Sequence, residues 1–585
     1  MLIREIFGTP IEEKIEPVIK VGDRQDQTKL AGEIGRFVVT PTIEKYLDDF
    51  LEHYTGTVRR HTSEIGVWIS GYFGSGKSHL GKMATLLIEN PVLDGVSAAQ
   101  RFQSRIPPAA VHRESLIRSL ALIPQCNSRV LAFNVNTVAD SKSTPLSKIL
   151  LTQWYLSKGY SGNVLFARVI EAELDKRGQL QALHDAAARI AGKPWPEIVA
   201  NPSYYSQALY AATCEVAPGE FHKPEEVATA LRTAGQGELF NVKFLLRTIL
   251  DDLEQEEKKT GKPTRFALLL DESGQWIEDS GDRLSQLQAL VEEAAEAGRG
   301  KLWIMVTTHE DMGSIYQNAK RLEAHGDFKK IEGRFHAKWN LTTENIELVL
   351  EDCVFRKNVA GKQNVEALYR SSPGVIRDLG QLKCDVRTLP ECSEERFTAM
   401  YPFLPYQIHL IPEVVKSLRS KGGRGEQLAG STRTLLAITQ DVLRAGRRNY
   451  LKLNVGEIVS FDEVYGNLAS EGEVLADARR DLGRIEEVVP GASGVTRRLA
   501  EVLYLIRELT YIPRTVDNLA RFLVERADDD LTTLVNRIRP ELDRLVKARL
   551  VTVSGEEYEF LTGEPLKRRW PIRPPGTAGL KEKLG

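Results

Sequence analysis

The sequence contains few cysteines and no long apolar run. Five cysteines occur among 585 residues, without a C-x-x-C pair. This pattern excludes a disulfide framework and a zinc ribbon, and it is consistent with a protein in a reducing compartment. The longest apolar runs, such as 266–270 and 302–306, have the length of strands and fall far below the ~20 residues of a membrane span. The opening segment, MLIREIFGTPIEEKIE, has acids where a signal peptide needs apolar residues. We therefore expect a cytoplasmic protein with no membrane partner.

The net charge is also small. Lys and Arg total 78 and Asp and Glu total 80, which gives a formal charge of −2. This balance excludes a polycation that coats nucleic acid over its whole surface, but a local basic face remains open. A hydrophobic content of 42% is that of a globular protein. At ~150 residues per domain, the length predicts about three to five domains.

Four apolar runs predict buried strands, at 66–70, 129–136, 265–272 and 301–308, and 336–341 is a weaker fifth candidate. Helical periodicity separates these runs, and this alternation indicates an α/β fold with a parallel sheet covered on both faces. The stretch 145–260 has helical periodicity and no convincing strand. We interpret it as a helical insertion.

A glycine-rich turn follows the first strand and matches G-x-x-x-x-G-K-[ST], the phosphate-binding loop of P-loop NTPases. Its glycines let backbone N–H groups surround phosphates, and the following helix adds its dipole. Lys77 would reach the β and γ phosphates, and the Ser78 hydroxyl would bind Mg²⁺. The predicted cofactors are ATP and Mg²⁺, and the predicted nucleotide-binding residues are Gly71, Gly74, Ser75, Gly76, Lys77, Ser78 and His79.

The third strand ends in Asp271 and Glu272. Two acids at the end of a buried strand are expected where Asp271 binds Mg²⁺ and Glu272 polarises the attacking water. The fourth strand ends in two threonines, of which we favour Thr308, with Thr307 close behind, as the polar group that holds the water or contacts the γ-phosphate. β-branched residues that simply complete a strand are the alternative.

Two arginines are candidates for contact with the nucleotide. In a ring of subunits, Arg334 could reach a neighbour's γ-phosphate as an arginine finger, which predicts an ATP-dependent homo-oligomer. A surface salt bridge is the alternative role for Arg334, and Arg321 and Arg356 are weaker competitors. Arg433 lies in a helical region that could contact nucleotide as a lid.

The last 90 residues have the pattern of a winged helix-turn-helix. Three helical segments are followed by two short alternating strands around Ser554-Gly555, which is a hairpin signal. Cations on the third helix would bind the phosphates of double-stranded DNA. A protein-interaction module, or a solvated charged face, is the alternative. The DNA-binding candidates are Arg537, Arg539 and Arg544, with Arg497 and Arg498 nearby.

These patterns divide the chain into five parts. They are an N-terminal segment packed on the ATPase core (1–60), a P-loop ATPase domain with the insertion (61–342), a helical lid (343–490), a winged helix (491–563) and a tail that looks like a linker (564–585).

The order of these motifs resembles an AAA+ ATPase of the origin-recognition type. The segments GVWISGYFGSGKSH, LLLDESGQWI, KIEGRF and YPFLPYQIHL are similar, more closely, to the BrxC/PglY family, the P-loop ATPases of bacteriophage exclusion (BREX) defence systems. The resemblance implies a bacterial cytoplasmic ATPase that acts with a DNA methyltransferase and other BREX proteins against phage. It also implies a longer protein, of which this chain would be an N-terminal portion or a short relative.

Three other functions stay open on the sequence alone. The first is a nucleotide-gated scaffold with little turnover, and the second is a regulator whose winged helix reads an operator. A small-molecule kinase is a weaker third. Glu272 and Arg334 favour an ATP hydrolase that remodels or loads a protein–DNA complex.

Overall fold

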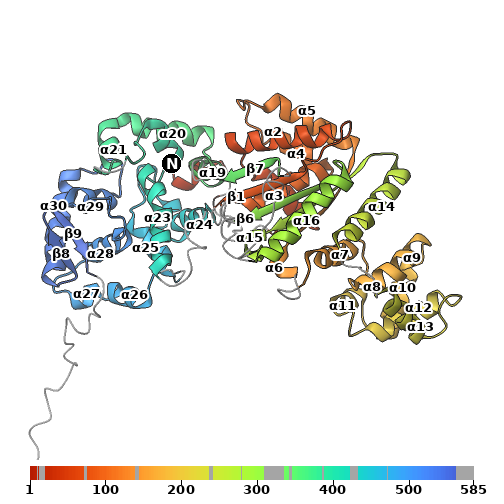
Figure 1. Ribbon diagram of the computed structural model, residues 1–585. Coiled ribbons are helices and arrows are strands. Elements are labelled where there is room, and N and C mark those ends of the chain that lie inside the picture. The colour runs from red at the N-terminus through yellow and green to blue at the C-terminus, as the bar shows by residue number, and fades with distance from the viewer. Residues whose placement is uncertain are drawn as a thin grey trace, which may run out of the picture. The chain divides into compact units, whose positions relative to one another are not determined.

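The computed structural model covers residues 1–585, and the chain forms two compact units (Figure 1). We call Ile19–Gly71 with Gly76–Leu341 the sheet unit, and Met1–Val18, Tyr72–Ser75 and Thr342–Gly585 the helical unit. The structure describes residues 1–8, 11, 20–71, 75–138, 144–235, 241–277, 280–308, 335–341, 346–384, 388–421, 432–470, 472 and 474–561.

The described part of the sheet unit contains a five-stranded parallel sheet with the strand order β4-β5-β6-β1-β7. This confirms the α/β class, the parallel sheet and all five predicted strands. The strands are β1 (Gly66–Gly71), β4 (Asn127–Asn134), β5 (Thr264–Asp271), β6 (Leu302–Thr308) and β7 (Ala337–Leu341). A separate two-stranded ribbon pairs β2 (Val92–Leu93) with β3 (Val96–Ser97).

The sheet is covered on both faces, as the continuous apolar runs predict. Side chains of adjacent strand residues point to opposite faces, so Leu268 and Ile304 pack in one apolar cluster and Leu269 and Met305 in another. Helices α7, α14 and α16 contribute to the first cluster, and α2, α3, α4 and α5 to the second. Figure 1 shows these two helical layers on either side of the strands. The central strands are therefore fully buried.

The remaining elements of the sheet unit are helical, and those between β4 and β5 confirm the predicted insertion. Helices α8 to α13 enclose an apolar core of their own, built around residues such as Phe166, Leu183 and Leu209. The helices are α1 (Gln27–Gly35), α2 (Pro41–Gly56), α3 (Lys77–Glu89), α4 (Ala98–Gln103), α5 (Arg113–Leu122), η2 (Ile123–Gln125), α6 (Val135–Val138), α7 (Leu146–Ser157), α8 (Val164–Phe166), the π-helix η3 (Ala167–Glu171), α9 (Ala172–Lys176), α10 (Leu180–Ala191), α11 (Trp195–Ala200), α12 (Ser206–Val216), α13 (Pro224–Ala234), α14 (Val242–Thr260), α15 (Ser273–Ile277) and α16 (Gly281–Gly298).

The helical unit has one continuous apolar core that runs from η1 to β9. Its elements up to residue 490 are η1 (Ile3–Ile6), α19 (Ile346–Cys353), α20 (Val359–Ser371), α21 (Pro373–Leu379), α22 (Glu394–Met400), α23 (Pro405–Lys421), α24 (Thr432–Ala445), η6 (Tyr450–Lys452), α25 (Asp462–Ser470), α26 (Ala476–Gly483) and α27 (Ile485–Val488). The helical character predicted for 343–490 is therefore present.

The N-terminal segment is divided between the two units, so that only its first residues depart from the predicted packing, whereas Leu30, Leu47 and Phe50 lie in a core of the sheet unit. Residues 1–60 were expected on the ATPase core, but Ile3 and Ile6 are fully buried in the core of the helical unit. The backbone N–H of Ile3 donates to the Leu453 carbonyl oxygen at 2.8 Å. The apolar spacing of these isoleucines does not say which core they enter. Residues 20–60 belong to the sheet unit.

The C-terminal part contains the three predicted helices and the predicted hairpin. These elements are α28 (Gly494–Ile506), α29 (Val516–Phe522), α30 (Leu531–Lys547), β8 (Val551–Ser554) and β9 (Glu557–Phe560), and the two strands pair antiparallel. Ser554 pairs with Glu557, so Gly555 and Glu556 form a two-residue turn. Gly555 has a φ of 63°, which only glycine adopts easily at the first position of such a turn. Residues 564–585 lie outside the described part.

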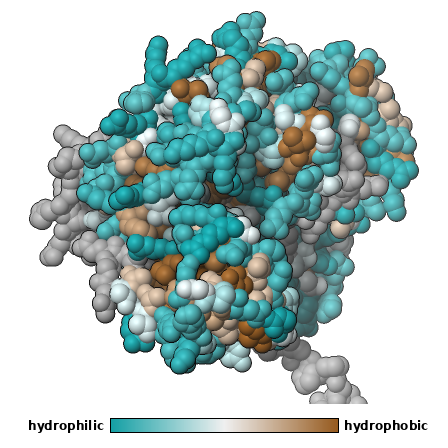
Figure 2. Space-filling model, turned by 90° about the vertical axis from the view of Figure 1, so that its right-hand side faces the viewer, coloured by the Kyte–Doolittle hydropathy of each residue, from teal (hydrophilic) through white to brown (hydrophobic). Residues whose placement is uncertain are grey.

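Across the described residues, no helix combines the length and apolar character that a membrane crossing requires. Figure 2 shows a face on which hydrophilic residues predominate and hydrophobic residues form small separate areas.

Candidate active site

The predicted site residues lie where parallel strands end. Gly71, Asp271 and Thr308 are the last residues of β1, β5 and β6, and Asn134, which the sequence does not single out, is the last residue of β4. Because these strands are parallel and in one sheet, their carboxyl ends form one edge, which is the usual position of ligand sites in open α/β sheets. In the strand order, β6 lies between β5 and β1.

Lys77 begins the helix that follows the glycine-rich turn. Gly76, the residue before it, has a φ of 95°, a left-handed conformation that favours glycine. The Lys77 side chain is buried, and its Nζ donates to the carbonyl oxygen of Gly71 at 2.7 Å. A buried ammonium is therefore held at the end of β1. Gly74 lies outside the described residues.

Asp271 is the centre of a hydrogen-bonded group of side chains. Its Oδ1 accepts from Ser78 Oγ at 3.0 Å and from Thr307 Oγ1 at 2.7 Å, and the residue is only 6% exposed. Burial raises the pKa of the Asp271 carboxyl, and the hydrogen bonds from Thr307 and Ser78 act against this rise. A carboxylate and a hydroxyl at this separation are the hard oxygen donors that suit Mg²⁺.

Glu272 is held in an unusual backbone conformation. Its φ is 56°, in the left-handed region that non-glycine residues seldom occupy and that recurs at functional sites. Its backbone N–H donates to Thr307 Oγ1 at 2.8 Å, and its Oε2 accepts from the amide of Asn134. The carboxylate is therefore positioned by a side chain from the neighbouring strand β4.

The two threonines at the end of β6 have different surroundings. Thr307 contacts both acids, Asp271 through its hydroxyl hydrogen and Glu272 through its oxygen. Thr308, the residue favoured from the sequence, is buried and lies in register with Ser70 of β1. Strand alternation directs these neighbouring side chains to opposite faces, so the structure places Thr307 at the acids.

Only some of the other residues predicted to contact nucleotide are described by the structure. Ser75 is partly buried, and the His79 ring packs edge-on against Phe37 with ring centres 4.9 Å apart. Arg433 is a residue of α24, but its side chain lies outside the description. Arg334 and its competitor Arg321 also fall outside the described residues.

The DNA-binding candidates all lie on α30. Arg537 and Arg539 are exposed, and among the described residues neither forms an ion pair. The Arg544 guanidinium, in contrast, forms an ion pair with Glu541 one turn away. Leu534, Ile538 and Leu542 form the buried face of the same helix, so Arg537 and Arg539 stand on its solvent side.

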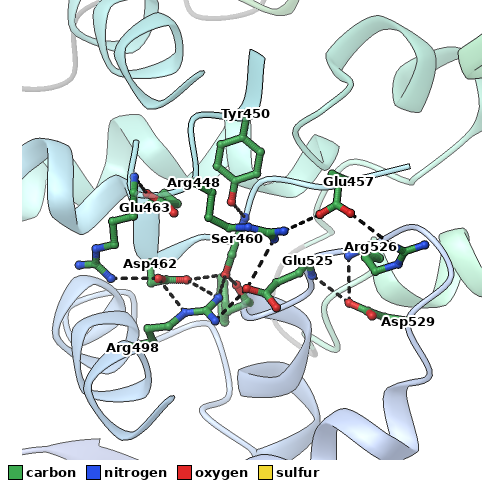
Figure 3. Close-up of polar contacts among 12 residues, drawn as sticks. Arg448, Tyr450, Glu457, Ser460, Asp462, Glu463, Arg498, Glu525, Arg526 and Asp529 are labelled. Carbon is green, nitrogen blue, oxygen red and sulfur yellow. Dashed lines mark hydrogen bonds and ion pairs between the residues drawn. The ribbon is translucent and has the colours of Figure 1, made fainter. Parts of the chain in front are cut away.

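Arg498 forms ion pairs within the helical unit and is not an exposed cation. It donates from Nε to Asp462 at 2.9 Å, from Nη1 to Glu525 at 2.9 Å and from Nη2 to Ser460 at 2.8 Å (Figure 3). Burial acts to lower the pKa of Arg498, but these carboxylates outweigh it and raise the pKa. Arg497 pairs with Glu501 at 3.0 Å. Both arginines bind carboxylates within the unit, and Arg498 links α28 to α25.

The sequence interpretation did not identify Asn134, and it ranked Thr307 below Thr308. Asn134 lies near the end of the predicted strand 129–136, which pairs in parallel with the strand carrying Asp271, and a polar residue near that end is the signal that could have found it. No family model matches this sequence.

Proposed function

We propose that this protein binds ATP with Mg²⁺ and hydrolyses it, as an AAA+-like P-loop ATPase. The observation that carries the proposal is the Asp271 group: a buried carboxylate bonded to Ser78 beside Lys77, with Glu272 held next to it in a left-handed conformation. A buried cation, an oxygen pair suited to Mg²⁺ and a second carboxylate are the groups that phosphoryl transfer to water requires.

In this mechanism each residue has a separate task. Lys77 gives up its contact with the Gly71 carbonyl and binds the β and γ phosphates. Ser78 and Asp271 would hold Mg²⁺, and the ion would neutralise phosphate charge. The Glu272 carboxylate orients and polarises the attacking water, while Asn134 and Thr307 position Glu272 through its side chain and its backbone N–H.

The finer assignments rest on the sequence patterns and, for the defence role and its partners, on the resemblance to the BrxC/PglY family. They are a helical lid at 343–490, a winged helix at 491–563 that contacts double-stranded DNA, and an ATP-dependent homo-oligomer with Arg334 as its finger. Action within a bacterial BREX defence system, with a DNA methyltransferase as one partner, belongs to the same proposal. The order of three helices and a hairpin supports the winged helix.

Substitution of the buried lysine tests nucleotide binding. Lys77→Ala should reduce the affinity for Mg-ATP by more than about 100-fold, since it removes a buried ion pair with phosphate worth about 3 kcal/mol or more. The matched control is Lys258→Ala, an exposed lysine on α14. Equilibrium binding of a fluorescent ATP analogue measures both variants. Equal affinity of Lys77→Ala and wild type would contradict the nucleotide site.

A further inference from the structure

A second group of side chains that could bind an ion lies at the end of the sheet opposite the candidate active site. His53, Glu64 and His336 each offer one ligand atom, and these atoms lie within 4.8 Å of one another. His53 is in the last turn of α2, Glu64 precedes β1 by two residues, and His336 directly precedes β7. The group therefore sits at the amino ends of β1 and β7, whereas the proposed ATP site is at carboxyl ends.

The three side chains are already in contact. His336 Nδ1 lies 3.3 Å from Glu64 Oε2, and the two imidazole rings are stacked obliquely with centres 4.8 Å apart. His53 Nε2 lies 3.0 Å from the carbonyl oxygen of Glu64. Because a carbonyl oxygen only accepts, Nε2 carries the proton in this contact, and Nδ1 is the nitrogen left to bind a metal ion. A backbone carbonyl is a common partner for the distal nitrogen of a metal-bound histidine.

The surroundings give an ion access and leave room for water. A cleft of about 750 Å³ opens at this group and is lined by residues that include Tyr46, Asp49, Glu52, His53, His336 and Lys338. The side chains of His336 and Glu64 are 47% and 50% exposed, so they can adjust. Tetrahedral bonds of about 2.0–2.1 Å place ligand atoms about 3.3 Å apart, so no pair here needs to close by more than about 1.5 Å.

We propose that His53, Glu64 and His336 form a binding site for one transition-metal ion of the Zn²⁺ type, with water in the fourth position. Two imidazoles and one carboxylate are borderline ligands that suit Zn²⁺ and its neighbours and do not suit Mg²⁺. The ion joins α2, the segment before β1 and the start of β7. Strand β7 is the last strand in the strand order, so the ion connects an edge strand to α2. These two elements already share a 3.1 Å hydrogen bond from Asn340 N to Tyr46 Oη.

The test uses the full chain, stripped of metal by a chelator and then given Zn²⁺ without nucleotide. Glu64→Gln and His336→Ala remove a ligand at half-exposed positions, and circular dichroism checks that both variants fold. Glu52→Gln is the matched control, because it makes the same charge change in the same cleft outside the group. Elemental analysis after gel filtration measures bound zinc, and titration measures the affinity. Visible absorption of the Co²⁺-loaded protein reports tetrahedral geometry.

We expect one tightly bound zinc ion per wild-type and Glu52→Gln chain, and affinity lower by more than about tenfold in both ligand variants. The unfolding temperature of the wild type should rise with Zn²⁺ and fall again with chelator. Zinc that stays bound in Glu64→Gln and His336→Ala would assign the ion to other residues and overturn the proposal. Absence of stoichiometric zinc in the wild type would overturn it as well.

Discussion

At the residue scale, Asn134 is the side chain that orients the Glu272 carboxylate. Asn134→Ala removes its hydrogen bond to Glu272 Oε2 and should slow ATP hydrolysis about tenfold, which corresponds to about 1.4 kcal/mol, with unchanged ATP affinity. Asn127→Ala is the control, because Asn127 lies at the other end of β4 and contacts Thr260. A steady-state rate measured at saturating Mg-ATP compares the two variants. Equal rates would show that Asn134 does not position Glu272.

The sequence predicts part of this site and misses the rest for a physical reason. Lys77, Ser78 and Asp271 come from local patterns, a glycine-rich turn and a buried strand that ends in acids, and the structure brings these three together. Asn134 and Glu272 are 138 residues apart in the sequence. Their contact depends on strand order, which a single sequence does not contain. The choice between Thr307 and Thr308 depends on which face each side chain occupies.

At the element scale, the insertion between β4 and β5 contains a buried acid whose protonation affects stability. Glu171, at the end of the π-helix η3, is fully buried and accepts from Ser161 N and Ser161 Oγ, both at 2.8 Å. Its Oε1 lies 4.0 Å from His184 Nε2. Burial raises the pKa of Glu171 from 4.5 to about 7, against the hydrogen bonds from Ser161.

The direction of the pH effect follows from this raised pKa. Between about pH 4.5 and 7 the folded protein holds a proton that the unfolded chain has released, so stability falls as the pH rises through this window. Relative to Glu171→Gln, the wild type should lose about 2 kcal/mol of unfolding free energy between about pH 5 and 7.5. Burial lowers the pKa of His184, and its Nε2 lies 4.0 Å from Glu171, so the comparison is made with His184→Gln in both proteins. Urea unfolding at the two pH values measures the difference, and a parallel pH dependence of both proteins would contradict it.

The solvent face of α30 gives a second test at this scale. If the proposed winged helix binds DNA phosphates, replacing both Arg537 and Arg539 by Ala should flatten the salt dependence by about 0.9 in log–log slope for each lost contact. Affinity should fall alike for unrelated duplexes, because phosphate contacts carry no sequence information. Arg544→Ala should change the slope less, since this guanidinium is paired with Glu541. DNA titrations at several salt concentrations compare these variants with wild type, and an unchanged double variant would favour a protein-interaction module.

Helical periodicity predicts the positions of the helices well, but it does not predict the contacts that their side chains make. The predicted segments of α28, α29 and α30, and the hairpin turn at Gly555, are present because amphipathic spacing and turn residues are local signals. The engagement of Arg498 by Asp462 and Glu525 is not local, and the sequence alone therefore placed Arg498 among exposed cations.

At the scale of the whole molecule, the chain forms two compact units where the sequence suggests four folded parts and a tail. The predicted boundary near residue 490 does not separate two cores, because one apolar cluster contains Leu482 and Leu499 together. The ion pairs of Arg498 with Asp462 and of Arg447 with Glu501 cross the same boundary. Boundaries inferred from composition shifts cannot detect such a shared core.

The central claim is that the carboxyl edge of the sheet hydrolyses ATP, and Glu272→Gln tests it most directly. The substitution keeps the shape of the side chain and removes its charge, so ATP binding should stay within about twofold of wild type. Hydrolysis at saturating Mg-ATP should fall by about 10²–10⁴-fold, the usual contribution of a general base. A Glu272→Gln protein that hydrolyses ATP at the wild-type rate would contradict the account, and so would a wild type that binds ATP without turnover.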